Sequence, residues 1–301
     1  LSDQRFDVIH GLTMYSPMAF MAVDYARRNG VASVFTCHSI IEPTYQVLLH
    51  LPLMPFIRGA NRIIAVSNAT AAFCRRLTLP AERIVTIPNG VDMETFNVGV
   101  DGAAFRSRLQ LDSQPVVVTA IRLAKRKRPD LLLSAFAAVL KSAPDTHLII
   151  AGAGAEEKRL QQLIRHYGLD RNVHMVGSIS KGQVAELMAA GDVFVLPSSL
   201  EAFGLAALEA AATGTAVVCS NAGGIPEVFQ HGVNALLYAP GDSADMAAAI
   251  VQLIQDAGIR GELGARGQEV ARQLTWEACA DRTLAVYEEA LRENESRRVH
   301  R

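Results

Sequence analysis

Short apolar runs alternate with helical stretches through almost the whole sequence, and no other feature constrains the fold as strongly. A short apolar run between turn residues is typical of a buried strand. The expected strands lie at residues 6–9, 32–36, 62–66, 84–87, 115–120, 147–151, 173–176, 192–196, 215–219 and 235–238. The helical stretches between them include 67–77, 130–140, 156–167, 181–190 and 244–253. Because strands that alternate with helices form parallel sheets, we predict an α/β protein that binds ligands beyond the carboxyl ends of its strands.

The alternation breaks around residues 97–102, soon after the turn signal Pro-Asn-Gly in residues 87–92. We therefore predict a first domain over 1–97, a second over 98–275, and a long amphipathic helix over 276–301 that returns to the first domain. The second domain has six expected strands, whereas the first has only four and the chain does not begin with methionine. We expect the first domain to be incomplete, with its start upstream.

Composition narrows the class of protein. The chain has 301 residues, of which 50% are hydrophobic and 20% charged, and its formal net charge is −1. That size suits two domains, and the charge gives no global field that favours nucleic acid. Four scattered cysteines without a Cys-x-x-Cys pair indicate buried thiols in a reducing compartment. Since we find neither a membrane-length apolar run nor a signal peptide, we expect a cytoplasmic protein.

Residues 198–209 hold two carboxylates, Glu201 and Glu209, eight residues apart. They follow a buried strand and lead into an alanine-rich helix, so Glu201 should lie in the loop and Glu209 about two turns into the helix. The N–H groups that open this helix form a predicted anion site, and they belong to Phe203, Gly204 and Leu205. This combination suits a ligand with phosphates and sugar hydroxyls; the alternative is an ordinary turn with two surface glutamates.

A basic run lies at the carboxyl end of the strand expected at 115–120. Five cations occur within residues 122–128, and Pro129 then starts a helix. Arginine offers a fork for phosphate oxygens and lysine a point charge. The position of the run favours phosphate binding, whereas a solvated basic loop or a nucleic-acid or membrane patch is the alternative.

Three glycine-containing loops are candidates for backbone contacts with a ligand. Residues 151–155, Ala-Gly-Ala-Gly-Ala, lack the third glycine and the acidic residue of a dinucleotide fingerprint, and we interpret them as a tight turn close to the ligand. Gly177 and Ile179, after the next strand, are candidates for contacts with a base. Residues 221–227 form a glycine-rich loop whose N–H groups could face the same cleft. A plain turn stays open for each loop.

Two histidines are candidates for acid/base roles, and several common catalytic and metal-binding motifs are absent. His38 follows the strand at 32–36, and His10 is expected in the equivalent place after 6–9; a structural role is the alternative for each. The sequence has no Asp-x-Asp pair and no His/Cys cluster with metal-ligand spacing. It also lacks a Gly-x-Ser-x-Gly elbow and a Walker-type loop. We expect no metal site.

Taken together, these residues resemble the large retaining glycosyltransferase family 4 of the GT-B fold. The resemblance rests on four elements in family order: residues 87–92, Arg122 with Lys127, the Glu-x7-Glu of 201–209, and 223–227. It covers residues 5 to about 292. It implies two Rossmann-like doubly wound parallel-sheet domains facing a cleft, the N-terminal one incomplete. The family usually has glycine where Arg128 stands, and its first strands with their glycine-rich loop are absent here.

The resemblance also implies roles. Arg122 and Lys127 would hold the diphosphate of a nucleotide-sugar in place of a metal, and Glu201 and His38 would face the donor sugar. Glu209 would bind the ribose. The N–H groups of residues 203–205 would support sugar and phosphate.

The implied function is metal-independent, cofactor-free transfer of a hexosyl or N-acetylhexosaminyl group from a UDP- or GDP-sugar, with retention. The acceptor would be a carbohydrate, a lipid or a small molecule. Peripheral contact with the inner membrane face is open, with Arg58, Arg62, Arg75 and Arg76 as its basis. The alternatives are a nucleotide-sugar epimerase or hydrolase, for which only His38 and His10 offer acid/base groups, and a non-catalytic nucleotide-sugar-binding fragment.

Overall fold

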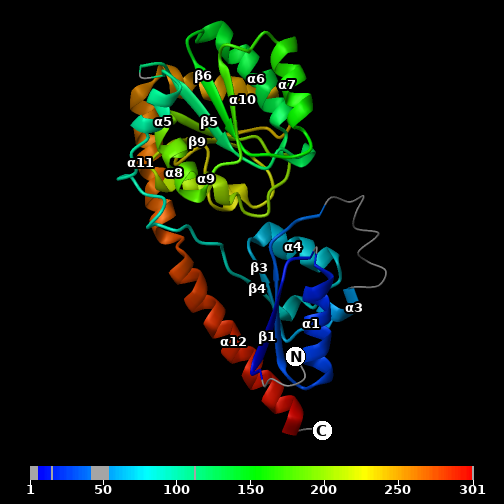
Figure 1. Ribbon diagram of the computed structural model, residues 1–301. Helices are drawn as coiled ribbons and strands as arrows, with labels where there is room; N and C mark the ends of the chain where they lie inside the picture. The colour runs from blue at the N-terminus through cyan, green and yellow to red at the C-terminus, as the bar shows by residue number, and fades with distance from the viewer. Residues whose placement is uncertain (1–5, 15, 42–53, 112, 300–301) are drawn as a thin grey trace. The chain divides into compact units, whose positions relative to one another are not determined.

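The structure is a computed structural model that describes residues 6–14, 16–41, 54–111 and 113–299 (Figure 1). The chain divides into two compact units, each built around one parallel sheet. Unit 1 consists of Leu1–Asn89 together with Trp276–Arg301, and unit 2 is Gly90–Thr275. Within the described ranges, no helix is both long enough and apolar enough to cross a membrane.

Unit 1 holds a four-stranded sheet in the order β1-β2-β3-β4, with all neighbours parallel. Its strands are β1 (Val8–Leu12), β2 (Ala32–Cys37), β3 (Arg62–Ala65) and β4 (Ile84–Thr86). Its helices are α1 (Pro17–Arg28), α3 (Met54–Arg58), α4 (Asn68–Arg76), the 3-10 turn η1 (Ala81–Arg83) and α12 (Trp276–Val299). Every residue of β2 is buried, because apolar clusters cover both faces of the sheet.

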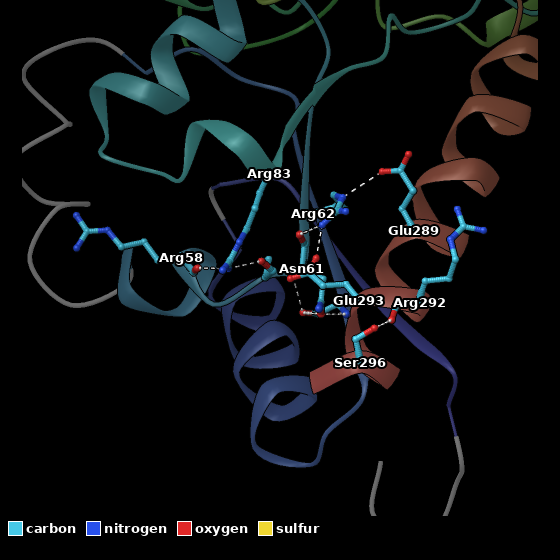
Figure 2. A network of polar contacts seen from close by, with 10 residues as sticks. Arg58, Asn61, Arg62, Arg83, Glu289, Arg292, Glu293 and Ser296 are labelled. Carbon is cyan, nitrogen blue, oxygen red and sulfur yellow. Dashed lines mark hydrogen bonds and ion pairs between the residues drawn. The ribbon is translucent and has the colours of Figure 1, made fainter. Parts of the chain in front are cut away.

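The long helix α12 packs on unit 1 through Val286, Tyr287 and Ala290. Polar contacts add to this packing: Figure 2 shows Arg62 between the carboxylates of Glu289 and Glu293. Two apolar residues of this helix, Ala278 and Leu284, are exposed. The buried stripe lies on a neighbouring side of the helix and includes Val286 and Ala290.

Unit 2 holds a six-stranded parallel sheet in the order β10-β9-β8-β5-β6-β7. Its strands are β5 (Val116–Ala120), β6 (His147–Ala151), β7 (Val173–Gly177), β8 (Val193–Leu196), β9 (Ala216–Ser220) and β10 (Leu236–Tyr238). The chain runs outward from β5 to β7 and then returns to place β8 on the other side of β5. This reversal creates a switch point at the carboxyl ends of β5 and β8, where ligands bind in open α/β sheets.

Seven helices and two 3-10 turns of unit 2 are described. They are α5 (Ala103–Arg108), η2 (Lys125–Lys127), α6 (Pro129–Ser142), α7 (Glu157–His166), α8 (Lys181–Ala190), α9 (Leu205–Ala212), η3 (Ile225–Glu227), α10 (Ser243–Gln255) and α11 (Ala257–Gln273). The sequence pattern did not single out α11, since its glycines obscure the apolar period. A Cβ at Gly264 would lie 2.3 Å from the Gly214 oxygen, so glycine allows close packing there.

All ten predicted strands are present, and apart from β1 their ends lie within one residue of the prediction. Strand β1 begins at Val8 and ends at Leu12, two to three residues later than expected. The compact units divide before Gly90, whereas the sequence placed the boundary at 97–102. The reason is that the Val91 N–H donates to the Leu274 oxygen at 2.8 Å, which ties the segment after Gly90 to unit 2.

The cysteines behave as predicted. Cys37, Cys74 and Cys219 are buried, Cys279 is partly buried, and all four are free thiols.

Candidate functional site

A pocket of about 380 Å³ opens at the carboxyl ends of β5, β6 and β7 in unit 2. It is lined by Ala120, Ile121, Arg122, Ala151, Gly152, Ala153, Ser178, Ile179, Val184 and Glu209. Three residues predicted from separate motifs therefore meet here: Arg122, Ile179 and Glu209. Gly177 ends β7 one residue before the lining, with a φ of +70° and no atom within 4 Å of its would-be Cβ.

The Ala-Gly-Ala-Gly-Ala turn lines the pocket through residues 151–153, and its glycines also allow close packing against a neighbouring loop. A Cβ on Gly152, whose φ is +130°, would lie 1.8 Å from the Ile121 oxygen, and one on Gly154 would lie 2.3 Å from the Leu123 oxygen. The two loops are joined by the Leu123 N–H, which donates to the Ala153 oxygen at 3.0 Å. The glycines thus allow the ends of β5 and β6 to lie together, and this pairing places Arg122 at the pocket.

The cations of the basic run differ in their surroundings. Arg122 is exposed, and its guanidinium makes no hydrogen bond or ion pair with the described residues. The turn η2 directs Lys127 into an ion pair with Glu201, and both side chains are largely buried. Arg128 bonds to Asp130 at 3.2 Å and has a left-handed φ of +49°. A left-handed conformation favours glycine, the residue that the family usually has there.

The loop that carries Glu201 is held from two sides. Ser199 donates through its N–H and its hydroxyl to the Arg126 oxygen, both at 3.1 Å. On the other side, the Gly224 N–H donates to the Glu201 oxygen at 2.9 Å. A Cβ on Gly223 would lie 1.9 Å from that same oxygen. The glycine-rich loop at 221–227, for which contacts with the ligand and a plain turn were both open, therefore positions Glu201.

Helix α9 begins as predicted from the stretch 198–209. Gly204 caps its start in a left-handed conformation with φ of +91°, and the first backbone bond runs from the Ala207 N–H to the Gly204 oxygen. Phe203 is buried. The N–H groups of Gly204 and Leu205 precede that first bond, so the helix start retains the capacity to bind an anion.

Glu209 lies just over one turn into α9, less far than the two turns predicted, and it lines the pocket. It is partly buried and forms no hydrogen bond with the described residues. Burial raises the pKa of its carboxyl to about 7; the charge of Lys181 opposes this rise and the charge of Asp92 adds to it. Lys181 itself forms an ion pair with Asp92 at 2.5 Å.

The two histidines belong to unit 1 and differ from each other. His38 follows β2 directly, as predicted, and hydrogen-bonds to Asn89. His10 lies inside β1, so its predicted position after the strand is wrong. Its Nδ1 lies 2.7 Å from the Tyr287 hydroxyl and its Nε2 lies 2.7 Å from the Thr36 hydroxyl. Burial lowers the pKa of His10 to about 4, and both ring nitrogens already have partners. His10 is therefore unsuited to acid/base chemistry.

Among the described residues, no three His, Cys, Asp or Glu side chains gather in a way that could hold a metal ion.

Comparison with known proteins identifies the family that this fold and site define. Residues 102–270 match the family described as glycosyl transferases group 1, and residues 1–95 match glycosyltransferase family 4. The chain therefore belongs to this glycosyltransferase family, and the predicted resemblance is confirmed.

The relatives are also glycosyltransferases by name. The chain is 29% identical over 99% of its length to the phosphatidylinositol N-acetylglucosaminyltransferase gpi3 subunit of Schizosaccharomyces pombe. It is 34% identical over 88% of its length to the D-inositol 3-phosphate glycosyltransferase of Segniliparus rotundus. It spans 64% and 62% of the lengths of these two relatives.

Solved structures share the fold. The structure of Anabaena HepE in complex with UDP and glucose has a TM-score of 0.86 and 25% sequence identity, over 94% of this chain and 78% of that chain. The predicted GT-B fold with two parallel sheets is confirmed.

Proposed function

We propose that this protein transfers a sugar from a nucleotide-diphospho-sugar to an acceptor, with retention of anomeric configuration and without a metal. The observation that carries the proposal is that Arg122 and Glu209 line one pocket at the switch point of unit 2. A cation without a partner and a carboxyl without a partner suit the two ends of a nucleoside diphosphate, its phosphates and its ribose. The HepE structure, which holds UDP and glucose, supports a UDP-sugar as the first donor to test.

Two cations of the basic run, Arg122 and Lys127, would act on the leaving group. Arg122 can grip the diphosphate with its guanidinium fork, and Lys127 adds a positive charge beside it. Charge that develops on the departing diphosphate would then meet two cations, the exposed Arg122 and the largely buried Lys127, and such electrostatic stabilisation lowers the energy of the transition state. In this scheme Arg122 and Lys127 do the work that other enzymes assign to a metal ion.

Glu201 would orient Lys127 and accept hydrogen bonds from the donor sugar. Its ion pair with Lys127 makes it a poor nucleophile, because an attacking carboxylate must first leave that cation. This argues for front-face attack assisted by the leaving phosphate, the route that the family resemblance implies, over a covalent intermediate on Glu201. The N–H groups at the start of α9 would support the sugar and phosphate, and His38 would face the donor sugar.

The relatives' names support a cyclic polyol as the acceptor. Both are named for inositol-containing substrates, one a lipid and one a phosphate ester. We therefore rank inositol derivatives first, followed by other carbohydrates and lipids. Peripheral membrane contact has a narrower basis than the sequence predicted, since Arg62 is bound by Glu289 and Glu293 (Figure 2). Three of the four arginines, Arg58, Arg75 and Arg76, remain exposed and form no ion pair with the described residues.

Calorimetry with UDP, GDP and ADP, in EDTA and then with magnesium, tests the donor site. We expect tight, EDTA-resistant binding of one nucleotide, followed by turnover with sugars of that nucleotide. The anomeric configuration of the product, read by NMR, then tests retention. Binding of none of the three would contradict the proposal.

A non-catalytic nucleotide-sugar-binding protein is the second candidate, because the chain spans less than two thirds of the length of the two relatives. Binding of the nucleotide-sugar without transfer, hydrolysis or epimerisation would favour this candidate.

A further inference from the structure

The turn that carries Lys127 ends in an unusual backbone conformation. Arg128, the residue directly after Lys127, has a φ of +49° and a ψ of +44°, which is left-handed. This conformation is costly for a residue that has a Cβ. Pro129 follows, and a residue before proline normally prefers an extended backbone. The local sequence therefore disfavours the conformation that Arg128 adopts, and contacts from elsewhere are needed to hold it.

The backbone of Arg128 decides how Lys127 is presented. The N–H groups of Lys127 and Arg128 donate to the backbone oxygens three residues earlier, at 2.9 and 3.1 Å, and these bonds close the turn η2. The Arg128 oxygen then accepts the N–H of Leu131, at 3.1 Å, as α6 begins. Arg128 is thus the joint between a closed turn and a helix. Its conformation sets the direction in which the Lys127 side chain leaves the turn towards Glu201.

The side chain of Arg128 belongs to a row of four alternating charges. Its guanidinium bonds to one oxygen of Asp130 at 3.2 Å, and the other oxygen of Asp130 lies 3.6 Å from the Arg159 guanidinium. Arg159 in turn bonds to Glu156 at 2.9 Å. The side chains of Arg128 and Asp130 are 32% and 23% exposed, whereas that of Arg159 is 51% exposed. Since solvent weakens exposed ion pairs, the pair of Arg128 with Asp130 should contribute most.

The far end of this row lies on a loop that lines the pocket. Glu156 comes shortly after residues 151–153, which line the pocket, and just before α7. Its N–H donates to the Leu123 oxygen, in the basic loop, at 3.0 Å. The charged row and this backbone bond therefore join the turn η2 to the loop between β6 and α7. Both loops belong to the proposed donor site.

We propose that Asp130 is a positioning residue for Lys127: it holds the guanidinium of Arg128, keeps the backbone of Arg128 left-handed, and so fixes the Lys127 ammonium beside Glu201. Arg159 supports Asp130 from behind. A glycine in place of Arg128 would adopt the same backbone without an anchor, because it has no Cβ. This inference rests on the proposed function, in which Lys127 acts on the leaving diphosphate.

The test is a double-mutant cycle on the full chain, in which Asp130→Ala is made in the wild type and in Arg128→Gly. In the wild type we expect kcat to fall about threefold to tenfold, a coupling common between residues of one ion-pair network. In Arg128→Gly the same change should leave kcat as it was, because glycine needs no anchor. Arg159→Ala in the wild type should have the same direction and a smaller size. An equal loss in both backgrounds, or no loss in the wild type, would overturn the inference.

Hydrogen exchange of residues 121–132, read by mass spectrometry, gives a second measurement that needs no substrate. Asp130→Ala should speed the exchange of the Lys127 and Arg128 amides in the wild type and have no effect in Arg128→Gly. The control is Glu157→Ala, which removes an exposed acidic residue from the first turn of α7 and should change neither kcat nor exchange. Faster exchange to the same extent in both backgrounds would show that Asp130 acts on α6 and not through Arg128. If the wild type binds no nucleotide, the proposed function fails, and exchange still decides whether Asp130 holds the turn.

Discussion

The loop before α9 and the second turn of α9 each present a glutamate to the site, and the two carboxyls are in different electrostatic states. Glu201 is buried and paired with Lys127, so its charge is neutralised by a fixed partner. Glu209 is partly buried without a hydrogen-bonding partner among the described residues, and burial raises its pKa to about 7. Residue type is the same in both places. The difference shows that the partners, which come from distant segments, decide what each carboxylate can do.

The largest effect is expected for Lys127, the partner of Glu201. Replacing Lys127 by Ala leaves Glu201 buried without its cation and removes charge stabilisation from the leaving group. We expect kcat to fall about 10²- to 10³-fold, as when one preorganised donor is removed from a charged transition state. Steady-state kinetics with the donor found by calorimetry measures this.

The control for Lys127 is Lys125→Ala, which alters an exposed lysine in the same basic run and should leave kcat close to that of the wild type. A Lys127→Ala protein with full activity would remove the leaving-group role from this residue.

The next largest effect is expected when Gly223, which packs against the loop that carries Glu201, is replaced. In Gly223→Ala, the new Cβ would lie 1.9 Å from the Glu201 oxygen, at a φ of +61°. We expect a loss of about 2–4 kcal/mol in the free energy of unfolding, from backbone strain and displacement of the Glu201 loop. Chemical denaturation followed by circular dichroism measures it. Gly232→Ala has a similar φ of +71° but open space around its Cβ, so it reports the strain alone. Equal losses in the two variants would show that Gly223 does not support Glu201.

A smaller effect is expected for Glu209, which has no hydrogen-bonding partner among the described residues. Glu209→Ala removes the carboxyl that we assign to the ribose, and we expect nucleotide binding to weaken by about 1–3 kcal/mol, the usual contribution of hydrogen bonds to a charged group. Affinity for inorganic pyrophosphate should stay the same, because that probe has no ribose. Calorimetry with UDP and pyrophosphate distinguishes the two. An unchanged UDP affinity would leave Glu209 without a role in the donor site.

The smallest effect concerns His10, a buried titratable group in unit 1 whose partners are neutral. Its pKa is lowered to about 4 from an ordinary value of 6.5, so the unfolded chain binds a proton at higher pH than the folded one. The stabilisation is complete above about pH 6.5 and declines as the pH falls towards 4. We expect about 1–2 kcal/mol less stability at pH 5 than at pH 7 from this group. Denaturation midpoints of wild type and His10→Gln across this range test it, since the variant should lose this part of the slope. Parallel curves would contradict the assignment.

The repeated pattern of strand and helix could be predicted because it depends on local features of the sequence, namely short apolar runs and turn residues. The same holds for the gathering of Arg122, Ile179 and Glu209, since the carboxyl ends of parallel strands meet at one edge of a sheet. The glycines were harder to interpret. Gly152 lines the pocket as a ligand-facing glycine would, but Gly152 and Gly223 are also each required by a carbonyl oxygen of another loop, Ile121 and Glu201 respectively. A sequence does not state which distant carbonyl a glycine will face.

The sequence by itself determined the parallel α/β sheets, the family and three of the residues that line the pocket of unit 2, Arg122, Ile179 and Glu209, because periodicity and motif spacing are local properties of the chain. Only the tertiary structure decided which side chains form ion pairs and hydrogen bonds with one another. Lys127 meets Glu201 across 74 residues, Lys181 meets Asp92 across 89, and His10 meets Tyr287 across 277. Such pairs form when packing brings separate loops together, and burial then sets the charge of each group. The raised pKa of Glu209 and the removal of His10 from acid/base chemistry are consequences of that packing.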